Sequence, residues 1–147
     1  MAYLLLRHFH SVLRWLVLSG LLFVLVRSVI FLIKPQKENS GGQKIVSISV
    51  SLMHLQILIG LILYFVSPRV IFSSESMSNP LLRFYLVEHI SLMLLSAIVI
   101  TFGSVYAKRA VNPTIKHLRL LLFFLFGLIL VYLAIPWPWK NLSGSWI

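Results

Sequence analysis

The chain has 147 residues, of which 59% are hydrophobic, and its mean hydropathy is +0.96. Soluble globular proteins contain about 45–50% apolar residues, so this composition indicates a membrane protein. The absence of cysteine excludes disulfides, thiolate metal sites and haem attached through thioether bonds. The formal net charge of +10 is concentrated around residues 27–44 and 108–119. Because membrane proteins retain Lys and Arg in their cytoplasmic loops, this charge indicates topology, and we expect no nucleic-acid partner.

Four apolar segments follow one another along the chain, at about residues 3–33, 45–66, 81–106 and 118–135. Each reaches or approaches the ~20 residues that a helix needs to cross ~30 Å of hydrocarbon. The first is too long for the apolar region of a signal peptide and is interpreted as a span. Continuous apolar runs favour helices over barrel strands. The sequence therefore predicts an all-α integral membrane four-helix bundle over residues 1–140, followed by a polar tail over residues 141–147.

The connecting segments predict the orientation of the spans. Residues 34–44 and 108–116 are basic, whereas residues 67–80 are rich in Ser and poor in Lys. Asn79-Pro80 and Asn112-Pro113 are typical helix starts. If the basic segments lie inside, both termini and residues 67–80 lie outside. The predicted topology is up-down-up-down, with Trp137 and Trp139 at the outer headgroup level.

Three histidines, His10, His54 and His89, lie within three different predicted spans. Imidazole in hydrocarbon is costly unless it is paired, hydrogen-bonded or bound to metal, so these residues are candidate cofactor or metal ligands. In an up-down-up-down bundle the first and third helices are diagonal neighbours. We therefore expect His10 and His89 to face one another at similar depth. His54, on an adjacent helix, would replace either ligand or bond to the cofactor edge.

The other two histidines are not assigned to this site. His117 begins the fourth predicted span and is expected to be an interfacial basic residue. His8 is expected near the outer surface, on a different side of its helix from His10.

Two charged residues lie close to the predicted site. Glu88 precedes His89, and Arg14 follows His10 by one turn on the same helical face. A buried unpaired charge is expensive, so we expect Arg14 and Glu88 to form an ion pair between the first and third helices. In a functional interpretation, Glu88, Gln56 and Tyr85 form a proton or quinone site. Arg14 would then steady a haem propionate or a quinone carbonyl.

Helical spacing groups further residues on faces that suit a cofactor wall. One face of the third helix carries Tyr85, His89, Met93 and Ser96. One face of the second helix carries Ser47, Ser51, His54, Leu58 and Leu61, and another carries Gln56 and Gly60. Met53 and Met93 could join the imidazoles in binding Cu(I), since thioether and imidazole both suit that ion. We find no hydrolase motif, no phosphate-binding loop and no di-iron carboxylate pattern.

Stretches from every predicted helix resemble a group of small bacterial four-span membrane proteins that are labelled cytochrome b-like. They are residues 10–15 (HSVLRW), 54–60 (HLQILIG), 64–68 (YFVSP), 83–89 (RFYLVEH) and 135–138 (IPWP). The resemblance covers essentially the whole chain. It implies a multi-pass protein of the bacterial inner membrane, with non-covalent b-type haem and a role in electron transport. Respiratory b cytochromes stack two haems between paired histidines on each helix, a pattern absent here, so we expect at most one haem.

Three functions are open on this reasoning. The first is a membrane-embedded protein that binds one haem b through two of His10, His54 and His89 and transfers electrons, with quinone as a further cofactor. The second is a non-catalytic integral subunit of a larger membrane complex, in which the polar residues are structural. The third is a copper-handling membrane protein. The expected partners are membrane lipid and other membrane subunits, and a role as an electron-transfer or accessory subunit is favoured over a stand-alone enzyme.

Overall fold

The computed structural model describes residues 1–35, 40–140 and 142, and this part of the chain is helical without strands, which confirms the all-α prediction. The long helices are α1 (Ala2–Ile33), α2 (Ser40–Val66), α4 (His89–Lys108) and α5 (Pro113–Ala134). The shorter elements are η1 (Ser74–Met77), α3 (Pro80–Arg83), the π-helical turn η2 (Phe84–Glu88) and η3 (Pro138–Lys140). Most of the predicted polar tail, residues 141 and 143–147, lies outside the described residues, as do residues 36–39 of the first connection.

Among the described residues, four helices are long and apolar enough to cross a membrane, and one of them, Pro80–Lys108, consists of α3, η2 and α4 in continuous succession. The four predicted segments are therefore confirmed as helices of sufficient length and apolarity to span a membrane, with changes at their ends. The fourth helix begins at residue 113 instead of 118, since the Asn112 side chain accepts a hydrogen bond from the Thr114 amide at 2.8 Å. Pro113 suits the first turn, where no amide hydrogen is needed. The helix therefore includes Lys116, which was predicted to lie in the connection.

The Asn112 cap gives a stability prediction. Asn112→Ala should lower the free energy of unfolding by about 1 kcal/mol, because the Thr114 amide loses its side-chain acceptor. Chemical unfolding of the purified protein in detergent micelles would measure the change. Asn112→Ser keeps a capping oxygen and is the matched control. Equal stability of the two variants would show that the cap contributes nothing.

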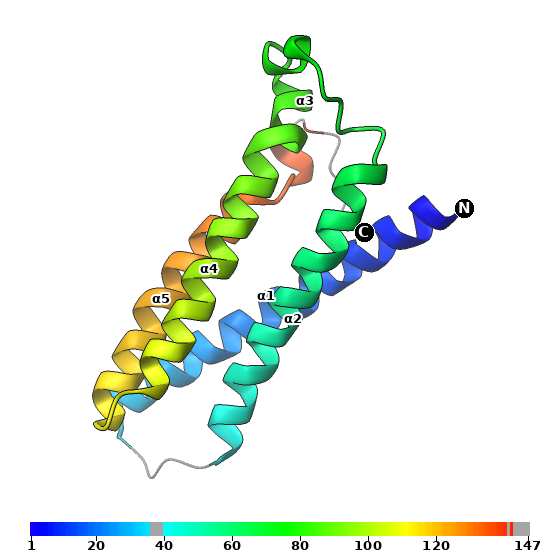
Figure 1. Cartoon of the computed structure of the whole chain (residues 1–147). Coiled ribbons are helices and arrows are strands. Elements are labelled where there is room, and N and C mark those ends of the chain that lie inside the picture. Colours follow the sequence, from blue (N-terminus) through cyan, green and yellow to red (C-terminus); the bar gives the residue numbers. More distant parts are fainter. Residues whose placement is uncertain (36–39, 141, 143–147) are drawn as a thin grey trace.

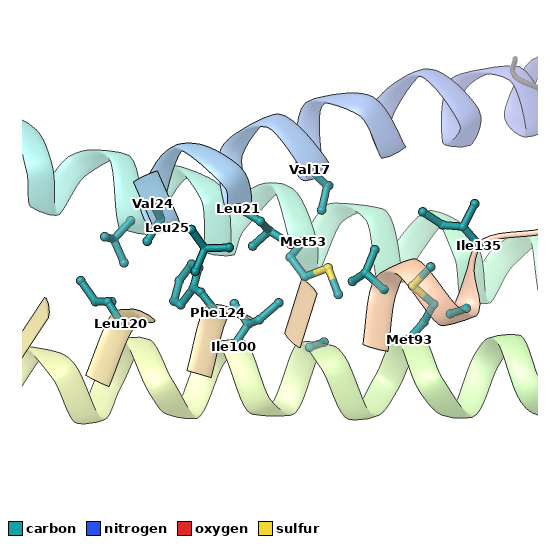
Figure 2. Close-up of a cluster of buried hydrophobic side chains, with 14 of the residues drawn as sticks. Val17, Leu21, Val24, Leu25, Met53, Met93, Ile100, Leu120, Phe124 and Ile135 are labelled. Atoms are coloured by element: carbon teal, nitrogen blue, oxygen red, sulfur yellow. The ribbon is translucent and has the colours of Figure 1, made fainter. Parts of the chain in front are cut away.

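The bundle packs in a ring in which α1 contacts α2 and α5, and α4 contacts α5 and α2. Figure 1 shows α1 crossing the other long helices at an angle. Figure 2 shows Leu21 of α1, Met53 of α2, Ile100 of α4 and Phe124 of α5 meeting in the core, and each is at most 1% exposed. Because lipid tails are as apolar as these side chains, close packing holds the helices together, not removal of apolar surface from water.

The most extensive contact between helices is that of α4 with α5. Gly127 of α5 packs directly against the Ile100 side chain. The Ser96 hydroxyl of α4 donates a hydrogen bond to the Gly127 carbonyl at 2.9 Å. Small residues and hydroxyl groups are common where membrane helices approach closely. This contact fixes the start of α4, and the site described next, against the end of α5.

Candidate functional site

A cavity of about 150 Å³ lies at the end of the bundle where α1 begins and α2 ends, which we call the cavity end. Its lining comes from α1, α2, the segment after α2, the start of the third span, and the segment after α5. The predicted site residues that line it are His10, Arg14, Gln56, Tyr85 and His89. The structure thus brings together side chains from distant parts of the chain, while two predicted site residues lie elsewhere.

His54 lies outside this cavity. Its side chain is exposed on the outer side of α2, and its Nε2 atom lies 2.8 Å from the Thr101 hydroxyl of α4. Residues in an α-helix advance by about 100° each, so His54 and Gln56 point to nearly opposite sides. Gln56 faces the cavity, and His54 therefore cannot. The described residues contain no group of three His, Cys, Asp or Glu side chains that could hold a metal ion.

Glu88 does not pair with Arg14, so that prediction is wrong. The Glu88 carboxylate accepts a hydrogen bond from Arg83 Nε at 2.8 Å, and both side chains are 43% exposed. The physical reason is local, because the π-helical turn η2 brings residues five positions apart onto one side of the helix. Arg14 instead lines the cavity, 9% exposed, with its guanidinium carbon 5.4 Å from the Trp15 ring centroid.

His89 is oriented by the end of α5. Its Nδ1 atom lies 2.7 Å from the Ala134 carbonyl oxygen, which can only accept a hydrogen bond. Nδ1 therefore carries a proton, and in the neutral ring Nε2 holds the lone pair. The Ala134 contact leaves His89 Nε2 as an acceptor for a ligand.

His10 is oriented by Gln56 in the complementary way. The Gln56 amide nitrogen donates to the His10 carbonyl at 3.1 Å and lies 3.3 Å from His10 Nε2. Because an amide nitrogen only donates, Nε2 accepts and the ring proton resides on Nδ1. His10 Nδ1 and Gln56 Oε1 are both buried without a hydrogen-bond partner in the described part of the chain. Such orphaned groups are costly unless a ligand or water satisfies them.

The cavity is rich in positive charge. Arg7, Arg14 and Arg69 line it, and its described lining contains no Asp or Glu. Arg69 donates to the Tyr85 hydroxyl at 2.9 Å, and that hydroxyl donates to the Leu142 carbonyl at 2.9 Å. The site therefore favours a ligand that carries, or can develop, negative charge.

Sequence reasoning missed several lining residues, although one signal was present. Tyr3, Arg7, His10 and Arg14 recur at intervals of three and four and all line the cavity from α1. Arg69 had no such signal, because it follows α2 and reaches the site only through the fold. Spacing alone could therefore have added Arg7 to the predicted site.

The π-helical turn η2 shapes the same wall. The His89 amide bonds to the Phe84 carbonyl, five residues earlier, as this type of turn requires. The Tyr64 hydroxyl of α2 donates to the Leu86 carbonyl within the turn at 2.9 Å. Turns of this kind often occur at functional sites. Here the turn contains Tyr85 and ends directly before His89, and both residues line the cavity.

The lining suits haem in residue type but not in space. Two imidazoles could ligate iron, and arginines could hold propionates. A cavity near 150 Å³, however, holds a molecule the size of benzene, whereas drug-sized ligands need about 300–1,000 Å³. His10 Nε2 is also engaged by Gln56. Of the two methionines predicted as copper ligands, Met93 lines the cavity with His10 and His89. Met53 does not line it and is 1% exposed in the core.

The remaining histidines differ in their surroundings. His117 is fully buried against other side chains, and its position at the membrane interface stays a prediction. Its ring stacks on Phe31 at a centroid distance of 4.0 Å, and Nδ1 lies 3.4 Å from the Ser28 hydroxyl. It is covered because α5 begins at residue 113 and packs on the end of α1 at this depth. His8 is exposed.

Comparison with known proteins gives no match to any family model, curated protein or solved structure. Function must therefore be argued from the geometry of the cavity.

Proposed function

We propose that this protein is a membrane subunit whose cavity binds the ring of a lipid-soluble quinol, in association with a larger electron-transfer complex. The observation that carries the proposal is the set of polar atoms in a ring-sized cavity. His10 Nδ1–H is a buried donor without a partner in the described chain, and Gln56 Oε1 is a buried acceptor without one. His89 Nε2 is a second acceptor, fixed by the Ala134 carbonyl.

The hydrogen-bonding pattern favours a quinol over a quinone. A quinone carbonyl only accepts hydrogen bonds and would leave Gln56 Oε1 and His89 Nε2 unsatisfied. Each quinol hydroxyl donates one hydrogen bond and also accepts, so the two hydroxyls of a quinol can donate to Gln56 Oε1 and His89 Nε2 while one of them accepts from His10 Nδ1–H. A volume of about 150 Å³ suits one ring.

The remaining lining supports the same ligand. Ile57, Ile90 and Leu94 provide apolar walls. The arginines would stabilise the negative charge of a quinol that loses a proton.

The topology in this proposal is up-down-up-down, with both termini and the cavity end outside. The ring of contacts, in which consecutive spans are neighbours, supports an antiparallel bundle. The basic residues near the opposite end support an inward orientation of that end. The resemblance to cytochrome b-like proteins supports a bacterial inner membrane.

Calorimetric titration of the purified protein in lipid nanodiscs with a short-chain ubiquinol, under anaerobic conditions, tests this function. We expect saturable binding and at least about a tenfold loss of affinity in His89→Phe, because one hydrogen bond in a dry site is lost. His54→Phe is the matched control, because it makes the same change outside the cavity. No saturable binding to the wild type, or equal losses in both variants, would refute the proposal.

A second candidate, one haem b between His10 and His89, is favoured by the presence of both imidazoles in one cavity. It requires the cavity to widen and Gln56 to release His10 Nε2. A bound haem would supply one-electron transfer. Absorption spectra of the protein after haem-replete expression test whether it binds haem. A Soret band that is lost in His10→Ala and His89→Ala but kept in His54→Ala supports haem, and its absence from the wild type excludes it.

A further inference from the structure

The face of α2 that points away from the cavity carries polar side chains in the middle of a membrane span. Ser51 and His54 are exposed, and Ser47 and the Thr101 partner of His54 on α4 are half-buried. We call these four residues the outer polar stripe. Leu55, Leu58 and Ile62 beside it are also exposed. The outer polar stripe would therefore face lipid in a single copy of the chain.

An imidazole in this position is poorly satisfied. His54 Nε2 bonds to Thr101, but Nδ1 has no hydrogen-bond partner among the described residues. Ionisable side chains within membrane spans almost always face a bundle interior or a water-filled cavity. Hydroxyl and imidazole groups commonly form hydrogen bonds between membrane helices. The stripe thus has the composition of a helix–helix interface.

We propose that the outer polar stripe is the interface between two copies of this chain, with α2 packed against α2. Two copies inserted in the same orientation are related by rotation about the membrane normal, and this rotation keeps every residue at its own depth. His54 of one copy therefore meets His54 of the other, and Ser51 meets Ser51.

Self-pairing is chemically satisfied in this arrangement. A hydroxyl contains a donor and an acceptor, so Ser51 can bond to Ser51. Because His54 Nε2 is bonded to Thr101, the two His54 rings pair through Nδ1, which carries the proton in one copy and accepts in the other. An interface that pairs one surface with itself is the usual form of a two-fold dimer. The exposed Leu55, Leu58 and Ile62 would supply the surrounding packing. This interface lies on the opposite side of α2 from Gln56 and does not depend on the proposed quinol site.

The chain has no cysteine, so a single introduced thiol reports contacts without interference. Ser51→Cys should give a disulfide-linked homodimer when native membranes are treated with an oxidant. Ser19→Cys is the matched control, since Ser19 is also exposed near the middle of a span but lies on α1. Absence of the homodimer, equal cross-linking of both variants, or cross-linking of Ser51→Cys to a different protein would overturn the proposal.

A second measurement keeps the test independent of cross-linking. His54→Leu should weaken dimerisation in lipid about threefold to tenfold, as expected for one interhelical hydrogen bond. Energy transfer between labelled copies at varied protein-to-lipid ratios would measure this change. A monomeric wild type at all ratios, or an unchanged dimer in His54→Leu, would contradict the assigned role of His54.

Discussion

Gly127→Ala is expected to lower the free energy of unfolding by about 2–3 kcal/mol, as overpacking in a tight core does. A Cβ atom at Gly127 would overlap Cγ1 of Ile100 and lie only 2.8 Å from its Cδ1. Ile100 is fully buried, and its β-branched side chain has little freedom to turn away. The helices must therefore separate, although alanine favours a helix over glycine by up to about 1 kcal/mol.

Reversible unfolding in micelles would measure this loss, and a double-mutant cycle identifies its cause. Ile100→Ala alone should cost about 2–5 kcal/mol, because it leaves a cavity. In the double variant the new methyl group enters that cavity, so the combined loss should be smaller than the sum of the two single losses by at least about 1 kcal/mol. Additive losses, or a stabilised Gly127→Ala, would show that α4 and α5 are not in this close contact.

The contact between α4 and α5 also affects the cavity, because it extends to His89 and Ala134. The packing of α4 on α5 places His89 Nδ1 2.7 Å from the Ala134 carbonyl. Separation of the helices would break this hydrogen bond, and the ring proton of His89 would no longer be fixed on Nδ1. Gly127→Ala should therefore also weaken ligand binding, although residue 127 does not line the cavity.

The four spans could be predicted from sequence because length and hydropathy determine whether a segment can cross a bilayer. The sequence did not predict which face of each helix points into the bundle and which points outward. In a soluble helix the apolar side marks the core, but in lipid both the core side and the outer side are apolar. The sequence pattern therefore did not distinguish whether His54 or Gln56 faces the bundle interior. The packing of the helices places Gln56 at the cavity.

Residues on α1 were more predictable than residues elsewhere in the site. The spacing of His10 and Arg14 correctly placed both on one wall. The partner of Glu88 depended instead on η2, and this π-helical turn accompanies the hydrogen bond between Tyr64 and the Leu86 carbonyl. Contacts of this kind join segments distant in sequence, so local patterns do not reveal them.

Gln56 gives the sharpest test of the proposed site. Gln56→Met preserves the approximate shape of the side chain but removes the amide that donates to the His10 carbonyl and faces His10 Nε2. Gln56 is 4% exposed, so no bulk water replaces the lost donor. We expect the free energy of unfolding to fall by about 1 kcal/mol, because the acceptors of His10 lose a donor while the unpartnered Gln56 Oε1 is removed as well.

The same change should allow the ring proton of His10 to reside on either Nδ1 or Nε2. Nitrogen-15 spectra of histidine-labelled protein should change from the Nδ1–H form to a mixture of both tautomers, and quinol affinity should fall about tenfold with the lost donor. Gln43→Met is the matched control, because Gln43 lies on the same helix but does not line the cavity. The spectrum of His10 and the quinol affinity could instead be the same in Gln56→Met as in Gln43→Met. Gln56 would then not determine the tautomer of His10, and the proposal that His10 Nδ1–H donates to the quinol oxygen would be refuted.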